Sequence, residues 1–234
     1  PSTWLTGKRV LVLGCGALGA PVAEQCVRAG VAALHVVDNG LVTPGILVRQ
    51  PYNDSDIGRP KAAALADRLS RIRTGFTVEG RVGNALDVSL QMNGDLRGYD
   101  LVVDATADAG IRSAVEDKRR VDGGFWPAVV IGHDATRGLV TVSTPEATGA
   151  GVAAMRKVAL HTFANPGEWG DIAEDFFPED PRTQMFFPEP GCSAPTFVGG
   201  AAQTTALAGI LLNETLLVPR LRTFARSSAW LGVP

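Results

Sequence analysis

The chain has 234 residues, of which 45% are hydrophobic and 20% are charged, and its formal net charge at pH 7 is −2. This size and composition are typical of one globular α/β domain with at most a small appendage, and the nearly balanced charge argues against a nucleic-acid partner. The sequence holds no apolar run of about 18 residues, which a membrane-spanning helix needs, so we expect no membrane partner either.

The first 40 residues predict a βαβ unit. Residues 8–14 and 33–38 are short apolar runs rich in valine and leucine, as expected of buried strands. The alanine- and valine-rich residues 17–29 between them predict a helix, which Gly30 ends. A parallel pair of strands joined by a helix favours a Rossmann-like architecture with a right-handed crossover.

The turn between the first strand and the helix carries the pattern G-x-G-x-x-G, which runs Gly14, Cys15, Gly16, Ala17, Leu18, Gly19. In such a turn the first glycine allows a tight bend, the second lets a phosphate approach the backbone, and the third lets helix and strand pack closely. The helix N-terminus presents free N–H groups to an anion. Asp38, about 20 residues on, is placed to bind ribose hydroxyls. The segment therefore predicts a nucleotide site.

The later elements predict a mostly parallel sheet with an antiparallel extension. After an irregular stretch at residues 43–51, we expect helices at residues 61–73, 111–120, 152–163 and 199–217, and strands at residues 76–82, 101–104, 128–131 and 138–143, the last two antiparallel. We divide the chain into a nucleotide-binding core at residues 1–144, a long crossover segment at 145–191 with a cysteine at its end, and a helical completion at 192–234 of the same domain.

Charged and polar residues beyond the glycine turn favour ATP over NAD. Arg49 and Gln50 follow the second strand, and Lys61 opens the next predicted helix. Asp104 and Asp108 lie at and beyond the end of a buried strand, near the edge where α/β sheets bind ligands. Two cations and one or two carboxylates suit a triphosphate with Mg²⁺, whereas hydride transfer needs none of them.

At these residues the chain resembles the E1-like activating enzymes, the family of ThiF, MoeB and the adenylation domains of ubiquitin-type E1 enzymes. The resemblance rests on the order and spacing of the glycine turn, Asp38, Arg49-Gln50, Gly58-x-Pro-Lys61 and Asp104-Ala-Thr106, and it resumes at residues 191–197. Among these enzymes, the chain looks closest to bacterial E1-like proteins that act with ubiquitin-like proteins.

The resemblance implies that ATP and the C-terminal carboxylate of a ubiquitin-like protein form an acyl adenylate, after which a cysteine takes the acyl group as a thioester. It further implies that Asp38 holds the ribose, that the turn residues, Gln50 and Thr106 line the nucleotide site, and that Arg49 and Lys61 contact the phosphates. Asp108 or Asp104 would hold Mg²⁺. A homodimer and an E2-like carrier are the further partners that it suggests.

The chain departs from the family pattern at several positions. Ile46 stands where the family usually has asparagine, and Gly40 where it commonly has a second acid. The family's Asp-Asn pair after the buried strand is here Ala107-Asp108. The paired C-x-x-C zinc ligands are absent, so we expect no structural zinc. The arginine that dimers of this family lend from the N-terminus to the partner's site is missing as well.

The three cysteines are Cys15, Cys26 and Cys192, which suggests a reducing, cytoplasmic environment rather than a disulfide framework. We expect Cys15 and Cys26 to be packing residues. Cys192 lies in a loop before a helix, where N–H groups and the helix dipole can lower the pKa of a thiol, and we predict it as the nucleophile. Its alternative role is that of a small apolar loop residue.

Other interpretations of the same residues stay open. Asp104 could cap the helix that follows it, and Arg49 and Lys61 could be solvated surface cations. For the whole chain, the alternatives are a degenerate E1-like binding module without turnover, an NAD(P)-dependent oxidoreductase, and an adenylating enzyme that forms no thioester.

Overall fold

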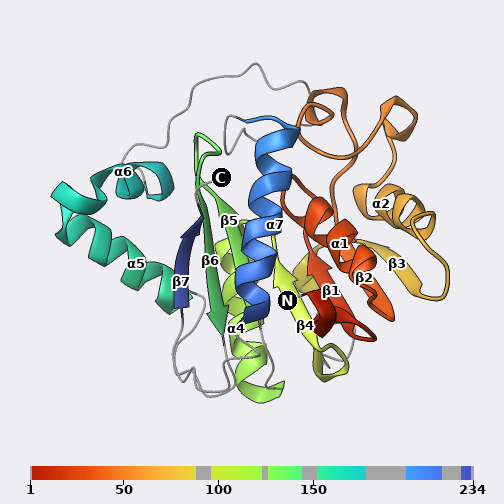
Figure 1. The fold of residues 1–234 in the computed structure, drawn as a ribbon, viewed down its shortest axis with the longest axis horizontal. Coiled ribbons are helices and arrows are strands. Elements are labelled where there is room, and N and C mark those ends of the chain that lie inside the picture. The colour runs from red at the N-terminus through yellow and green to blue at the C-terminus, as the bar shows by residue number, and fades with distance from the viewer. Residues whose placement is uncertain are drawn as a thin grey trace.

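The computed structural model describes residues 2–87, 96–122, 126–143, 152–177, 199–217 and 228–232. These residues form a sheet of seven strands in the order β3-β2-β1-β4-β5-β6-β7 (Figure 1). The strands are β1 Arg9–Leu13, β2 Ala33–Asp38, β3 Thr77–Val82, β4 Leu101–Asp104, β5 Trp126–Ile131, β6 Gly138–Ser143 and β7 Ser228–Gly232. The first five are parallel, and β6 and β7 add antiparallel pairs, which confirms the predicted fold class.

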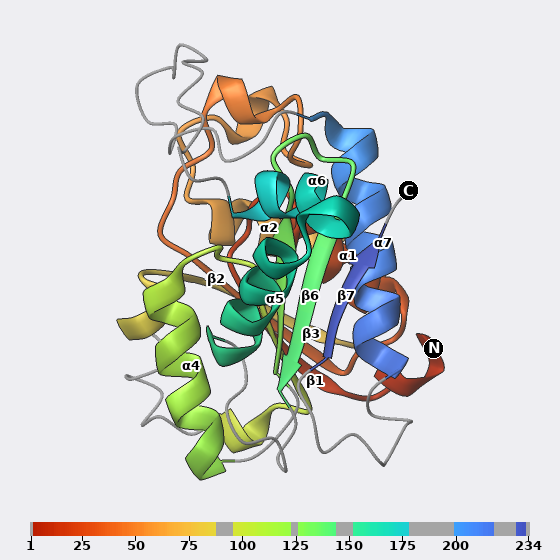
Figure 2. The same ribbon diagram turned by 90° about the vertical axis from the view of Figure 1, so that its left-hand side faces the viewer.

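Helices cover both faces of the sheet. Figures 1 and 2 show α1, α2 and α7 on one face, α4 on the other, and α5 with α6 beyond the β7 edge. Their bounds are α1 Gly19–Arg28, α2 Lys61–Ser70, α4 Ala109–Asp122, α5 Val152–Ala164, α6 Pro166–Phe176 and α7 Ala201–Leu217, with 3-10 turns at Ser2–Leu5, Pro44–Ile46, Asp54–Asp56 and Leu96–Gly98. In the part of the chain described, no helix is long and apolar enough to cross a bilayer.

The sequence patterns did not predict helix α6 or strand β7. Helix α6 begins with Pro166 directly after Asn165, in the predicted crossover segment and beyond the helix expected at residues 152–163. Proline in the first helical turn is a helix-start signal, because its fixed φ suits a helix and its missing N–H is not needed there. Strand β7 has only five residues and pairs with β6 from residue 138 to residue 142. Its pairing depends on a strand about 90 residues earlier, which local periodicity does not reveal.

The strand order creates a switch point between β1 and β4. The chain moves from β1 outward through β2 to β3, then returns to β4 on the other side of β1. Alternate residues of β1 feed two apolar layers, with Val10 and Val12 in one cluster and Leu11 and Leu13 in the other. Open α/β sheets bind ligands at the carboxyl ends of strands at such a switch point. The fold therefore directs attention to the turns that follow β1 and β4.

On the α4 face of the sheet, His35 of β2 lies in a polar cluster. Its Nδ1 is 2.5 Å from the Tyr99 hydroxyl, and its Nε2 is 3.5 Å from a carboxylate oxygen of Glu79. Burial lowers the pKa of His35, and the nearby Arg81 and Arg9 lower it further, while Glu79 opposes them. The fold therefore favours the neutral imidazole.

This preference predicts how stability depends on pH. An unfolded histidine titrates near pH 6.5, above the folded pKa of His35, so the unfolded chain binds more protons in the window just below about pH 6.5. The free energy of unfolding should therefore fall as pH is lowered from 7.5 to 5.5. Urea unfolding at several pH values should show a smaller fall in His35→Gln than in the wild type. His161→Gln, which replaces an exposed histidine of α5, is the control. Equal pH dependence in all three proteins would contradict the prediction.

Candidate functional site

The glycine turn at residues 14–19 follows β1 and packs tightly against the backbone that follows β4. Gly14 has φ +91°, and a Cβ there would lie 2.7 Å from the carbonyl oxygen of Ala105, which follows β4. A Cβ on Gly19 would lie 1.9 Å from the Gly14 carbonyl oxygen, whereas at Gly16 the space within 4 Å is empty. Sterics therefore require glycine at positions 14 and 19. Position 16 leaves the backbone open to an approaching group, as the predicted phosphate contact needs. The side chains of Ala17 and Leu18 are buried, so the contacts predicted for these two residues fall to their backbone.

Asp38, the last residue of β2, holds this turn in place. Its Oδ2 accepts a hydrogen bond from the Cys15 N–H at 2.6 Å, and its Oδ1 accepts one from the Gly40 N–H at 2.6 Å. An ionised carboxylate has about four acceptor positions, so these bonds leave capacity for ribose hydroxyls. The structure thus gives Asp38 a structural role beside its predicted ribose contact.

Lys61, the first residue of α2, reaches toward the same turn. Its N–H donates to the Gly40 carbonyl at 2.9 Å, and a Cβ on Gly40 would lie 3.5 Å from both Cδ and Cε of the lysine. Burial and the Asp38 carboxylate together hold the pKa of the Cys15 thiol well above its usual value. The positive charge of Lys61 opposes this shift. The 3.5 Å distances from a Gly40 Cβ to the lysine chain are ordinary van der Waals distances, whereas the same Cβ would lie only 3.0 Å from Oδ1 of Asp38. Glycine at position 40, where the resemblance leads us to expect an acid, therefore spares Asp38 a tight contact.

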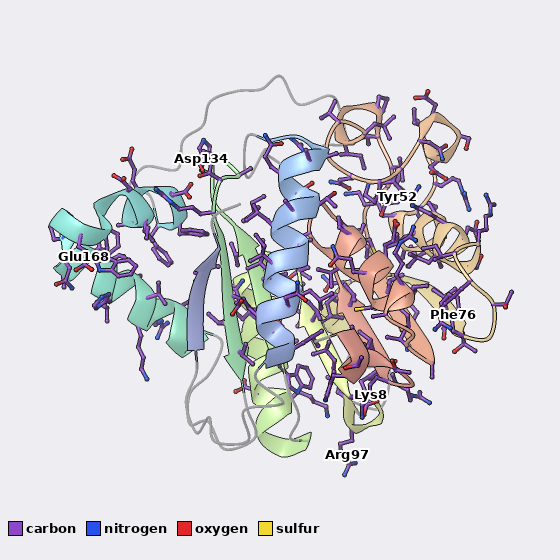
Figure 3. The ribbon with its side chains drawn as sticks, viewed as in Figure 1. Lys8, Tyr52, Phe76, Arg97, Asp134 and Glu168 are labelled. Carbon is purple, nitrogen blue, oxygen red and sulfur yellow. The ribbon has the colours of Figure 1, made fainter. Side chains whose placement is uncertain are left out.

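Tyr52 joins the turn to α2, a role that sequence analysis missed (Figure 3). Its side chain is 7% exposed, and its hydroxyl donates to the Cys15 carbonyl at 2.7 Å and lies 3.4 Å from the Lys61 carbonyl. Burial raises the pKa of Tyr52, with Cys15 and Asp38 adding to the shift, so the hydroxyl stays a donor. A lone tyrosine in a loop carries no periodic signal, so only the tertiary structure identifies it.

Arg49 and Gln50 follow a 3-10 turn between β2 and α2. The N–H groups of both residues donate to the Ile46 carbonyl, at 3.1 and 2.9 Å. Ile46 itself is 5% exposed and packs in the core, so at this position an apolar anchor replaces the family's asparagine. The Gln50 side chain is buried, and its Oε1 has no hydrogen-bond partner among the described residues. That oxygen is a candidate ligand contact.

The turn after β4 holds the two predicted metal-binding acids in different roles. Asp104 is 3% exposed, and its Oδ1 accepts bonds from the Thr106 N–H and hydroxyl at 3.0 and 2.6 Å. Burial raises the pKa of Asp104, against the hydrogen bonds from Thr106. Asp108 caps α4, because its Oδ1 accepts from the N–H groups of Gly110 and Ile111 at 2.7 and 2.9 Å. The alternative that Asp104 caps this helix is therefore wrong.

Arg112 of α4 is a second site residue that sequence analysis missed. It is 9% exposed, and its Nε lies 3.8 Å from Oδ2 of Asp104. Neither atom has a hydrogen-bond partner in the described structure. The free oxygen of Asp104 thus faces an arginine, whereas Oδ2 of the exposed Asp108 is not used by the cap. Of the two acids, Asp108 fits Mg²⁺ better, since this ion takes one or two carboxylates together with substrate phosphates.

No described residues form a cluster of three or more metal-ligating side chains. Cys15 and Cys26 are free and fully buried, and burial raises the pKa of Cys26 to about 12, which confirms them as packing residues. Cys192 lies outside the described residues.

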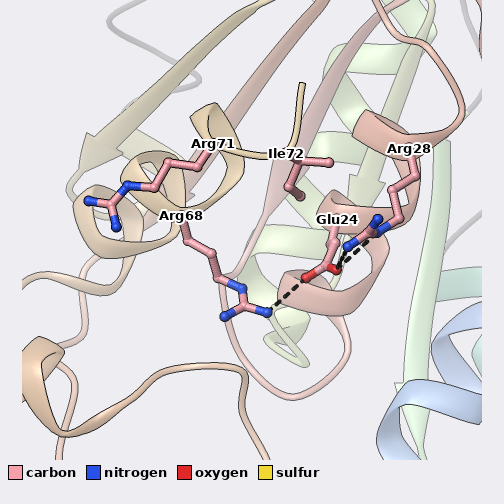
Figure 4. A pocket seen from close by; sticks show the side chains of 5 residues that line it. All are labelled: Glu24, Arg28, Arg68, Arg71 and Ile72. Atoms are coloured by element: carbon pink, nitrogen blue, oxygen red, sulfur yellow. Dashed lines mark hydrogen bonds and ion pairs between the residues drawn. The ribbon is translucent and has the colours of Figure 1, made fainter. Parts of the chain in front are cut away.

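A hollow of about 300 Å³ lies between the C-terminal halves of α1 and α2, away from the glycine turn at the start of α1 (Figure 4). Glu24, Arg28, Arg68, Arg71 and Ile72 line it. Glu24 pairs with Arg28 at 2.8 Å and with Arg68 at 3.3 Å, which neutralises part of the charge. Basic side chains at helix C-termini are also stabilising in themselves, so this hollow is not assigned to the nucleotide.

Comparison with known proteins identifies the family of this chain. The model of the ThiF family matches residues 4–225. The chain is 33% identical over 107 residues to the ATP-dependent ubiquitin transferase-like protein Cap2 of Enterobacter hormaechei, covering 46% of this chain and 18% of Cap2. It is 32% identical over 178 residues to the sulfur carrier protein adenylyltransferase of Thermus thermophilus, covering 74% and 56%. The chain thus spans well under two thirds of the length of these relatives.

Solved structures support the same fold. The crystal structure of E. coli MccB with ATP aligns with 92% of this chain and 57% of its own, at a TM-score of 0.58 and 15% identity. That of selenomethionine PaaA aligns with 99% and 71%, at a TM-score of 0.66 and 14% identity. At this identity the likeness concerns the fold alone.

The Tyr52 hydroxyl is expected to stabilise both the fold and the nucleotide site. Tyr52→Phe removes a donor from the buried Cys15 carbonyl, which should lower the free energy of unfolding by about 1–3 kcal/mol and weaken ATP binding several-fold. Tyr99→Phe makes the same chemical change away from the turn and should leave ATP affinity unchanged. Urea unfolding and calorimetric titration measure the two effects. Unaltered ATP affinity in Tyr52→Phe would contradict this role.

Ala107 offers a test of the metal site. It is exposed and has φ +58°, a left-handed conformation that aspartate tolerates better than alanine. Ala107→Asp restores the acid of the family pattern, and we expect it to change stability by no more than about 0.5 kcal/mol. It should tighten ATP binding in the presence of Mg²⁺ but not in EDTA. Equal gains in both buffers would show that the new acid does not act through the metal.

Proposed function

The chain belongs to the ThiF family, and from that premise we propose that it uses ATP to adenylate the C-terminal carboxylate of a ubiquitin-like protein. One observation carries the proposal: Gly14, Asp38 and Lys61 converge on one turn at the switch point of the sheet. The names of the relatives from Enterobacter and Thermus point to the same class of reaction.

In the proposed first step, a carboxylate oxygen of the partner attacks the α-phosphorus of ATP. The bond from that phosphorus to the bridging oxygen breaks, and pyrophosphate leaves. Lys61 and Arg49 neutralise the charge that develops on the phosphates, and the N–H groups at the start of α1 add to this field. Catalysis comes from positioning and charge stabilisation, so no general base is required at the carboxylate. Asp108 would hold the Mg²⁺ that accompanies the triphosphate, with Asp104 as the alternative ligand.

A second proposed step transfers the acyl group to Cys192. The thiolate sulfur attacks the acyl carbon of the adenylate, a thioester forms, and AMP leaves. Cys15 and Cys26 are unsuited to this role because both are fully buried and both thiols have raised pKa values. The sequence has three cysteines, so Cys192 is the remaining candidate nucleophile. A downstream E2-like carrier, a homodimeric assembly and a cytoplasmic location complete the proposal.

Two assays test these steps separately. ATP–pyrophosphate exchange with candidate ubiquitin-like proteins reports adenylation, and intact mass without reductant reports the thioester. We expect Lys61→Ala to lose about 100-fold or more in exchange, since it removes a charge that acts on the phosphates. Cys192→Ala should keep exchange and lose the thiol-sensitive adduct. Arg71→Ala, which removes a cation from the hollow in Figure 4, is the matched control and should change neither.

The alternatives give different results in the same experiments. Thermal stabilisation by NADH and not by ATP would support an oxidoreductase. ATP binding without exchange for any partner would support a binding module. Normal exchange without an adduct would retain adenylation and remove Cys192 as the nucleophile.

A further inference from the structure

The first turn of helix α7 contacts the backbone of the loop that carries Arg49 through hydrogen bonds, which together form a clasp. The Ala201 N–H donates to the Val48 carbonyl at 3.0 Å. The Thr204 hydroxyl lies within hydrogen-bond distance of the Arg49 carbonyl, at 3.2 Å. Figures 1 and 2 both show the start of α7 beside the loop between β2 and α2. These contacts join segments about 150 residues apart in sequence.

Thr204 is unusual among the polar residues of α7. It is 0% exposed, and its hydroxyl also lies 3.3 Å from the Gly200 carbonyl and 3.2 Å from the Ala201 carbonyl. A threonine in a helix usually satisfies its hydroxyl with such carbonyls of the preceding turn. Thr215 does this, with its hydroxyl 2.8 Å from the Leu211 carbonyl. Thr204 has the additional acceptor on Arg49, so its hydroxyl can connect the helix to the loop.

The rest of α7 is held firmly against α1, the helix that starts at the glycine turn. Leu207, Ala208 and Leu211 are 0% exposed and belong to the apolar cluster that includes Cys26 of α1. A Cβ on Gly209 would lie 3.5 Å from Nε2 of Gln25, so the helices approach closely. Since α1 and α7 share one packed core, the position of α7 is set relative to the glycine turn.

The Arg49 backbone is thus held from two directions. On one side its N–H donates to the Ile46 carbonyl at 3.1 Å, and on the other its carbonyl meets Thr204 of a helix packed on α1. This arrangement fixes the distance between the loop of Arg49 and the glycine turn. Two groups that bind one triphosphate need such a fixed spacing, because loosening of either costs affinity.

We propose that Thr204 is a positioning residue for nucleotide binding: its hydroxyl holds the Arg49 backbone so that the arginine meets the phosphates of ATP bound at the glycine turn. This inference rests on the proposed ATP site and adds a residue to it. It implies coupling in both directions, because a ligand that orders Arg49 must also stabilise the docking of α7.

Hydrogen exchange without nucleotide tests the clasp itself. Thr204→Val keeps the shape of the side chain and removes the donor. Amides of residues 46–52 should then exchange about fivefold faster, as expected for the loss of one hydrogen bond. Thr204→Ser keeps the hydroxyl and should exchange like the wild type. Thr215→Val removes a buried hydroxyl that bonds only within α7 and should leave residues 46–52 unchanged. Equal exchange at residues 46–52 in Thr204→Val and Thr215→Val would overturn the proposal.

Ligand binding tests the consequence. Thr204→Val should weaken ATP by about fivefold and leave adenosine affinity unchanged, since only ATP reaches the arginine. In the wild type, ATP should slow exchange at residues 201–206 as well as at 46–52. This measurement uses the wild type alone, so it does not depend on whether a variant folds. ATP that binds tightly without protecting residues 201–206 would overturn the coupling. If the wild type binds no ATP, the proposed function fails, while exchange without nucleotide still decides whether Thr204 holds the loop.

Discussion

The candidate site depends on one close approach, between the turn after β1 and the turn after β4. Gly14 lies so near the Ala105 carbonyl that a methyl group would collide with it, and a methyl group on Gly19 would lie closer still to the Gly14 carbonyl. The Ala105 N–H also donates to the Leu13 carbonyl at 2.8 Å, which continues the pairing of β1 and β4 past the strand ends. These contacts bring the acids after β4 beside the turn after β1, where α/β folds bind nucleotides.

Around this approach, polar groups serve the fold and the candidate site together. Asp38 accepts from the N–H of Cys15, and Tyr52 donates to its carbonyl. A turn whose backbone groups are satisfied in this way has little freedom to rearrange, so its open position at Gly16 is preorganised for a ligand. Thr106 and Asp108 have equivalent roles after β4, where one bonds Asp104 and the other caps α4. A site that stabilises charge on phosphates does so mainly through preorganised polar groups.

Departures from the family pattern become understandable in structural terms. Ile46 replaces a polar side chain but supplies its carbonyl to Arg49 and Gln50 while its apolar body fills the core. Gly40 brings no acid, and it spares Oδ1 of Asp38 a Cβ only 3.0 Å away. Ala107 has a left-handed backbone conformation and brings no carboxylate. In each case a polar side chain of the family pattern is absent.

The sequence by itself determined the architecture and indicated where in it the candidate site lies. The spacing of Gly14, Gly19 and Asp38 predicts the first βαβ unit, because close packing and tight turns allow few other residues at those places. It could not separate the roles of Asp104 and Asp108, since either acid can cap a helix and the choice depends on where the helix begins. It also missed Tyr52, Arg112 and the clasp of Thr204 on Arg49. Those contacts join residues that periodicity does not relate, and only the packing of α2, α4 and α7 around the sheet decides which side chains meet.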